Sequence, residues 1–180
     1  MSDFATQRRM MVDTQIRPSD VTKFPIIDAF LSVRREAFVP AGMKGVAYSE
    51  ASIHLAPSRD ILEPRTFAKI LDAVNIQPNE MVLDLGCGLG YSAAVIAHMA
   101  EAVIAVEQED DLADEAQINL AAEGVDNAVL VQATLSEGAP QHGPYDVITM
   151  QGAVETVPQV ILDQLKDGGR IAALFVQGAL

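Results

Sequence analysis

Residues 83–91 read LDLGCGLGY, an apolar run followed by a turn with three alternating glycines. The apolar run from Met81 to Leu85 predicts a strand, and residues 91–100 after the turn predict a helix. Glycines in such a turn let the backbone bend sharply and let a ligand approach without meeting Cβ atoms. A strand, a glycine turn and a helix start in this order therefore predict a ligand site at the carboxyl edge of a sheet.

The next predicted strand, 103–107, ends in an acidic residue, Glu107, seventeen residues after Gly90. A carboxylate at this place accepts hydrogen bonds from both hydroxyls of a ribose. Tyr91 stands where the dinucleotide pattern G-x-G-x-x-G has its third glycine, which disfavours NAD and FAD. The turn also contains no lysine to hold a phosphate. Together these residues predict an adenosine-containing ligand without phosphates, and S-adenosylmethionine meets that description.

Strands and helices alternate through the rest of the chain. Further strands are predicted at 128–132, 145–150 and 170–176, and further helices at 110–123 and 157–165. Fully apolar strands that alternate with helices indicate a parallel sheet covered on both faces. We therefore predict an α/β fold with a doubly wound, mainly parallel sheet over residues 65–180. Because the chain stops just after the fifth strand, whose open edge proteins usually cover, we expect this domain to be incomplete at its C-terminal end.

Residues 1–64 are predicted to form an N-terminal helical extension with a substrate-side loop. Apolar residues recur at helical spacing before residue 17 and again over 26–33. Residues 41–64 are rich in glycine, proline and serine, so we expect a loop with at most short strands there. Pro64 is well placed to open the next helix, since its fixed φ suits the first helical position.

Composition and charge exclude several classes of function. The 180 residues include 49% hydrophobic side chains, enough for one well-packed domain. The 12 basic side chains stand against 25 acidic ones, a net charge of −13, which opposes charge-driven binding to nucleic acid or to an anionic membrane. The single cysteine, Cys87, and three scattered histidines give no zinc spacing, so no metal site is predicted. The sequence shows neither a signal-peptide pattern nor an apolar stretch of ~18–20 residues, so we expect a soluble cytoplasmic protein.

Several segments resemble the protein-L-isoaspartate O-methyltransferase family, whose members are class I S-adenosylmethionine-dependent methyltransferases. Residues 33–40, VRREAFVP, are similar to the family's R-x-x-F-V-P segment, and residues 82–97 are similar to its cofactor motif. Residues 145–148, YDVI, and 165–170, LKDGGR, are similar to its fourth and fifth strand regions. The resemblance implies a Rossmann-like enzyme that binds S-adenosylmethionine or S-adenosylhomocysteine and methylates isoaspartyl proteins or peptides during protein repair.

The resemblance also implies which residues bind the cofactor. The glycines shape the methionine and ribose pocket, Glu107 binds the ribose hydroxyls, and Gln108 lies beside the adenine. The family's G-D-G segment falls on residues 133–135, where Thr134 replaces the aspartate that meets the adenine. Cys87 is interpreted as a small residue that fills the turn, not as a nucleophile. The full set of implied cofactor-binding residues is Asp84, Gly86, Cys87, Gly88, Gly90, Glu107, Gln108, Thr134 and Leu135.

One departure from the family concerns methyl transfer itself, and no residue is assigned to catalysis. The family's T-I-S-x-P segment reads DILEP at residues 60–64, so Leu62 stands in place of the serine beside the transfer centre. Leucine cannot hydrogen-bond a carboxylate, and an apolar neighbour disfavours an anionic nucleophile. Ser58 lies four residues upstream and is an alternative for that role. Two hypotheses stay open: a methyltransferase acting on a carboxylate or another acceptor, and a non-catalytic relative that only binds S-adenosylmethionine or S-adenosylhomocysteine.

Overall fold

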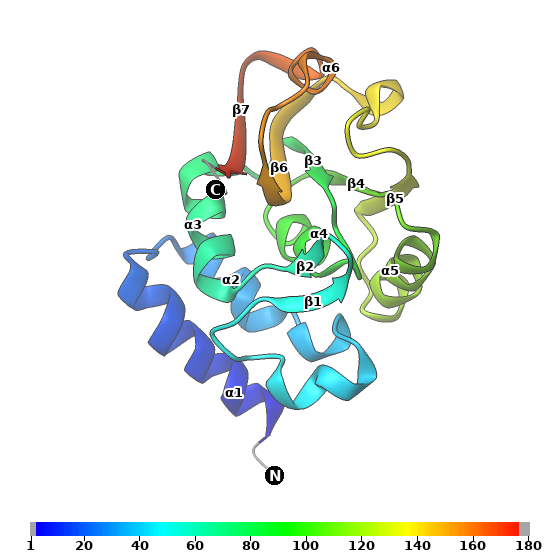
Figure 1. Ribbon diagram of the computed structural model, residues 1–180. Coiled ribbons are helices and arrows are strands. Elements are labelled where there is room, and N and C mark those ends of the chain that lie inside the picture. Colours follow the sequence, from blue (N-terminus) through cyan, green and yellow to red (C-terminus); the bar gives the residue numbers. More distant parts are fainter. Residues whose placement is uncertain (1–2, 177–180) are drawn as a thin grey trace.

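The computed structural model describes residues 3–176, which form a five-stranded parallel sheet with helices packed on it (Figure 1). The strands lie in the order β5-β4-β3-β6-β7, and every neighbouring pair in this sheet is parallel. Their bounds are β3 (Met81–Leu85), β4 (Ala102–Glu107), β5 (Ala128–Gln132), β6 (Tyr145–Val154) and β7 (Leu165–Phe175). The chain order reverses between β3 and β6, which is where open α/β sheets bind their ligands. The prediction of a doubly wound, mainly parallel α/β sheet is confirmed.

Side chains of the central strands point alternately to two hydrophobic cores. In β3, Val82 faces one core and Leu83 the other, and in β4 Val103 and Ile104 divide in the same way. Successive side chains of a strand point to opposite faces of a sheet, so an all-apolar strand has to be covered on both sides. The two cores therefore account for the continuous apolar runs of the sequence.

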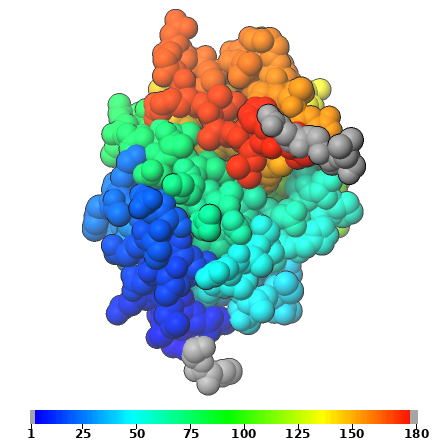
Figure 2. All heavy atoms as spheres, turned by 60° about the vertical axis from the view of Figure 1, so that its left-hand side comes forward, coloured from blue at the N-terminus to red at the C-terminus, as the bar shows by residue number. Residues whose placement is uncertain are grey.

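The two faces of the sheet are covered unequally. The first core receives side chains from each of the five helices α1 to α5, whereas the second is closed by residues from 133–139 and 157–161. The helices are α1 (Phe4–Met11), α2 (Phe24–Ser32), α3 (Pro64–Val74), α4 (Tyr91–Ala97), α5 (Asp110–Ala122) and α6 (Gln159–Leu162), with 3-10 or π-helical turns at Val12–Ile16, Arg17–Ser19, Arg35–Ala37, Ala41–Val46 and Pro140–His142. α3 lies between the blue N-terminal segment and the red strand β7, and Figure 2 shows these regions adjoining on one face.

Within residues 3–176, no helix has the length and apolar character needed to cross a membrane.

The structure differs from the sequence prediction at the last strand and at the helix before it. The helix predicted at 157–165 is only the single turn α6, because Leu165 already pairs with Tyr145 at the start of β7. The pairing then shifts register before Arg170 meets Val147. Apolar spacing alone does not separate a short helix from a buried strand, which is why the prediction was wrong here.

Residues 53–61 form a small antiparallel hairpin of β1 (Ile53–Ala56) and β2 (Arg59–Ile61), here called the hairpin. The two strands make a sheet of their own, and Figure 1 shows them in front of α4. Ser58 at the hairpin's turn has a φ of 60°. The hairpin lies directly on the glycine turn, since a Cβ added to Gly88 would come within 2.7 Å of Leu55 Cδ1.

Candidate active site

The glycine turn joins β3 to α4 at the carboxyl edge of the sheet. Gly86, Gly88 and Gly90 have φ values of 80°, 56° and 96°, a left-handed region that other residues enter only with strain. The backbone N–H of Gly86 donates to the carbonyl of Val106 at 2.8 Å, which ties the turn to the end of β4. The sequence therefore folds into the predicted strand, turn and helix because glycine occupies each position that requires a positive φ.

Asp84 lies beneath the turn as the centre of a buried polar network. Its carboxylate accepts hydrogen bonds from Ser92 Oγ at 2.5 Å, from Thr149 Oγ1 at 2.8 Å and from Gln151 Nε2 at 2.7 Å. Burial raises the pKa of Asp84 above its ordinary value, and these three hydrogen bonds oppose the rise. Asp84 thereby links β3, α4 and β6, and it fixes the orientation of Gln151.

Glu107, the predicted ribose ligand, lies beside the glycine turn and is fully buried. Its Oε2 accepts a hydrogen bond from the backbone N–H of Gly88 at 2.9 Å. Its Oε1 accepts hydrogen bonds from the backbone N–H of Gln108 at 2.8 Å and from Arg59 Nε at 3.0 Å. The structure thus brings the acid and the turn together as the sequence predicts. The ion pair with Arg59 was missed because the hairpin that carries it has no periodic signal.

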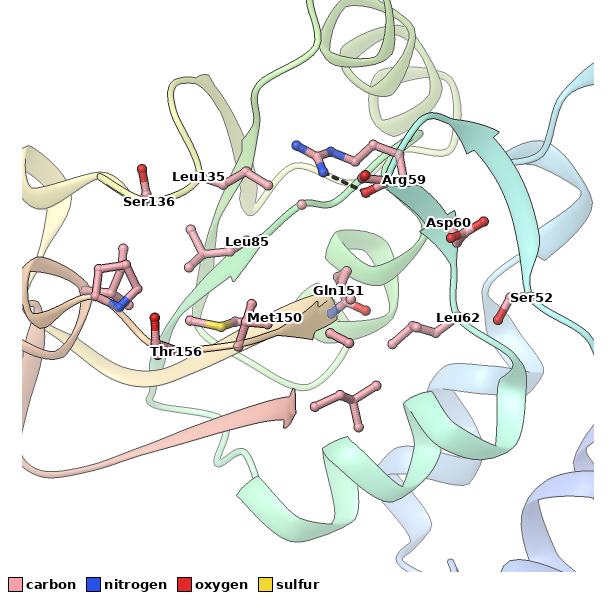
Figure 3. A pocket seen from close by; sticks show the side chains of 18 residues that line it. Ser52, Arg59, Asp60, Leu62, Leu85, Leu135, Ser136, Met150, Gln151 and Thr156 are labelled. Atoms are coloured by element: carbon pink, nitrogen blue, oxygen red, sulfur yellow. Dashed lines mark hydrogen bonds between the residues drawn. The ribbon is translucent and has the colours of Figure 1, made fainter. Parts of the chain in front are cut away.

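A cavity of about 660 Å³ opens at this edge of the sheet (Figure 3). The hairpin and the loop before it, the glycine turn, the segment after β5 and the end of β6 all contribute to its wall. Its labelled lining residues are Ser52, Arg59, Asp60, Leu62, Leu85, Leu135, Ser136, Met150, Gln151 and Thr156. Of the predicted cofactor-binding residues, Gly86 and Leu135 line this cavity. The described lining does not include Asp84, Cys87, Gly88, Gly90, Glu107, Gln108 or Thr134.

Of the three residues predicted near the adenine, Gln108, Thr134 and Leu135, only Leu135 lines the cavity. The backbone N–H of Leu135 donates to the side-chain oxygen of Gln108 at 3.4 Å, so the structure brings these two residues together. Thr134 is exposed, and its carbonyl accepts the backbone N–H of Glu137 at 3.0 Å. Leu135 does line the cavity, where it forms an apolar wall together with Leu85 and Met150. The sequence analysis missed Met150 and Gln151. These residues reach the cavity only because β6 pairs with β3 in the sheet.

Cys87 is buried in the turn, as a space-filling residue would be. Burial raises the pKa of its thiol well above the ordinary value, and the nearby carboxylates of Asp84 and Glu107 raise it further. Because the thiolate is the reactive form of cysteine, the burial of Cys87 and its raised pKa both disfavour a role as a nucleophile.

The segment that departs from the family motif forms one wall of the cavity. Leu62 lines it and faces the side of Gln151 in Figure 3. Ser58 and Asp60 line it as well, and Asp60 is paired with His54 at 3.0 Å. Glu63 lies outside the described lining, and its carboxylate accepts the hydroxyl of Thr66 at 2.5 Å. Leu62 therefore does stand at the cavity wall, just after the hairpin, and Ser58 at the hairpin's turn lines the same cavity.

Comparison with known sequences shows the family to which the chain belongs. The family model described as protein-L-isoaspartate(D-aspartate) O-methyltransferase matches residues 6–177. A protein-L-isoaspartate O-methyltransferase of Synechococcus sp. is 36% identical over 93% of this chain and 69% of its own length. One of Methanoculleus marisnigri is 34% identical over 93% of this chain and 76% of its own length. The chain belongs to this family. The predicted resemblance is thereby confirmed, and with it the class, the S-adenosylmethionine-dependent methyltransferases.

Solved structures agree with this membership in the protein-L-isoaspartate O-methyltransferase family. A structure titled protein-L-isoaspartate O-methyltransferase superimposes with a TM-score of 0.80 at 25% identity. It covers 96% of this chain, and this chain spans 55% of its length. A Plasmodium falciparum protein, described as a putative member in complex with S-adenosyl-L-homocysteine, superimposes with a TM-score of 0.81 over 99% of this chain and 87% of its own. At 17% identity it supports the fold, and this family fold is the one described above.

Proposed function

We propose that this protein transfers a methyl group from S-adenosylmethionine to the free carboxylate of isoaspartyl residues in damaged proteins or peptides. The observation that carries the proposal is the pairing of the glycine turn with Glu107, through the 2.9 Å hydrogen bond from Gly88, at the edge of a cavity of about 660 Å³. Membership in the protein-L-isoaspartate O-methyltransferase family supplies the reaction class.

The residues present fit S-adenosylmethionine. The cavity has the size usual for small-molecule sites, about 300–1,000 Å³. Glu107, which lies behind Arg59 and outside the described lining, is the acceptor that we assign to the ribose hydroxyls. Leu85, Leu135 and Met150 supply an apolar wall for the adenine. The left-handed glycine Gly86 gives the cavity a backbone surface free of a side chain. When bound, the cofactor supplies an electrophilic methyl group on a sulfonium.

The chain itself has to orient the acceptor. A carboxylate has an ordinary pKa of ~4, so at neutral pH it is already a nucleophile and no general base is required. What remains is alignment of the carboxylate with the methyl group, which contributes through proximity and orientation. Leu62 cannot hydrogen-bond the acceptor, so we assign that orientation to the amide of Gln151 and the hydroxyl of Ser58, which line the same cavity. Asp84 holds the Gln151 amide in place.

A second candidate, a non-catalytic protein that only binds S-adenosylmethionine or S-adenosylhomocysteine, is favoured by one observation. Leu62 lines the cavity at the motif position where the resembled family carries a serine. An apolar side chain beside a carboxylate leaves the anion without one of its hydrogen bonds, which costs free energy. The two candidates therefore share the cofactor site and differ only at the acceptor.

A transfer assay separates the two candidates. The protein is incubated with radiolabelled S-adenosylmethionine and an isoaspartyl peptide, with the matching aspartyl peptide as control. We expect label on the isoaspartyl peptide alone, and Leu62→Ser should increase the rate of transfer. Binding of S-adenosylhomocysteine in calorimetry without transfer by either protein would favour the non-catalytic candidate.

The role of Glu107 has its own test. Glu107→Ala should weaken S-adenosylhomocysteine binding by about 1–3 kcal/mol, because hydrogen bonds to a charged acceptor are lost. Calorimetry measures the dissociation constant, and circular dichroism confirms that the variant is folded. An unchanged dissociation constant would remove Glu107 from the ribose site.

A further inference from the structure

Glu107 is sealed off from the cavity that it is proposed to serve. Its side chain is 0% exposed, and the described lining of the cavity includes Arg59 and not Glu107. Figure 3 shows the guanidinium of Arg59 at the end of the cavity where the hairpin meets the glycine turn. The carboxylate assigned to the ribose thus lies behind the arginine.

Most of the acceptor positions of Glu107 are already in use. A carboxylate has about four acceptor positions, two on each oxygen. Oε1 of Glu107 already accepts Arg59 Nε at 3.0 Å and the backbone N–H groups of Gln108 and Glu109 at 2.8 and 3.2 Å. Oε2 accepts the backbone N–H of Gly88. On this count Oε1 is full and one position on Oε2 remains for a ribose hydroxyl. Because the Glu107 side chain is 0% exposed, the hydroxyl reaches that position only if Arg59 moves aside.

The backbone donors allow Arg59 to leave at modest cost. After its departure Glu107 keeps hydrogen bonds from three backbone N–H groups, those of Gly88, Gln108 and Glu109, so the buried charge is not orphaned. Arg59 is 13% exposed and also donates from Nη1 to the carbonyl of Ser58 at 2.8 Å. Its guanidinium therefore keeps a partner on the hairpin and reaches solvent by a short movement.

The tip of the hairpin is held less firmly than its ends. Ile53 and Ile61 at the ends are buried in the first core, whereas the hairpin forms a two-stranded sheet of its own without hydrogen-bonded pairing to the five-stranded sheet. Its pairing is irregular between His54 and Ala56, and its turn residue Ser58 has a φ of 60°. Leu55 rests on Gly88, so opening the hairpin also uncovers the glycine turn.

We propose that Arg59 is the residue that controls cofactor entry: its guanidinium covers the Glu107 carboxylate on the side of the cavity, and cofactor binding displaces Arg59 together with the tip of the hairpin around Ser58. The proposal rests on the proposed function, because it takes the ligand to be S-adenosylmethionine or S-adenosylhomocysteine. Arg59 acts as an internal competitor, so its removal strengthens cofactor binding.

The test compares Arg59→Gln with Arg65→Gln, a matched control that removes the same charge from an exposed position on α3. Calorimetry and stopped-flow binding of S-adenosylhomocysteine are measured on the full chain. We expect Arg59→Gln to lower the dissociation constant about tenfold, mainly through faster association, and Arg65→Gln to match the wild type. In the ligand-free protein, amide hydrogens of residues 53–61 should exchange faster in Arg59→Gln than in Arg65→Gln.

Three other outcomes overturn the proposal in different ways. Weaker binding by Arg59→Gln would make Arg59 a cofactor ligand, and an unchanged dissociation constant would show that the ion pair does not compete. In both cases the wild type binds S-adenosylhomocysteine, so the proposed function stands. Absence of binding by the wild type and both variants would overturn the proposed function together with the role of Arg59.

Discussion

The glycine turn and the hairpin meet at Glu107, yet they are built in opposite ways. The turn joins the central strand β3 to α4, and its Gly86 N–H donates a hydrogen bond to Val106 of β4. The hairpin has two short strands with irregular pairing and places a serine, Ser58, at a positive φ. The sheet fixes the ligand-binding edge, whereas the hairpin controls access to it. Ligand binding and access are therefore assigned to regions of different construction.

The largest predicted effect on stability is that of a substitution in the glycine turn. Gly90→Ala should lower the free energy of unfolding by about 2–3 kcal/mol, because φ is 96° and the new Cβ would lie 3.2 Å from Leu120 Cγ. Denaturant unfolding measures the change. Gly124→Ala is the control, since φ is 69° but no heavy atom lies within 4 Å of its Cβ, and it should cost only about 1 kcal/mol. Equal losses in the two variants would show that crowding against α5 contributes nothing.

A second prediction uses pH to examine the network beneath the turn. Burial raises the pKa of Asp84, so the folded protein holds this proton more tightly than the unfolded chain. Tighter binding of this proton stabilises the folded protein. The contribution is complete below about pH 4, the ordinary pKa of an aspartate in an unfolded chain, and it is lost as the pH rises through the folded-state pKa of Asp84. Asp84→Asn should remove this loss while changing stability at low pH by about 1 kcal/mol, the worth of an altered hydrogen bond.

The free energy of unfolding of both proteins, measured across this pH range, checks the prediction. The exposed acid Asp111 provides the control, since Asp111→Asn removes the same charge at the surface. If wild type and Asp84→Asn kept a constant difference at all pH values, Asp84 would titrate alike in the folded and unfolded states.

The smallest predicted effect concerns the hairpin. Ser58→Gly relieves the positive φ of 60° but adds freedom to the unfolded chain, so stability should change by about 0.5 kcal/mol or less. Ser49 does not have a positive φ, so Ser49→Gly should cost about 0.5–1 kcal/mol. Thermal or denaturant unfolding compares the two. A loss at Ser58 as large as that at Ser49 would mean that the hairpin turn is not strained.

The parts of the site that could be predicted from sequence are those with a periodic or positional signal. Apolar runs predicted the central strands, and the 90-to-107 spacing placed Glu107 beside the turn, which the hydrogen bond from Gly88 confirms. Arg59 and Gln151 carried no such signal. Arg59 lies in an irregular segment, and Gln151 reaches the site only because β6 pairs with β3. Spacing along the chain cannot reveal contacts that depend on strand order.

The sequence by itself determined the strand, turn and helix around residues 81–97, because glycine at each positive φ and apolar residues on both faces of the strands leave one local solution. It also determined membership in the family, through segments spread along the chain. Only the tertiary structure decided that Arg59 covers Glu107 and that Leu62 and Gln151 share one cavity. These contacts depend on how the hairpin folds back over the sheet, and the side chains that make them are far apart in the sequence.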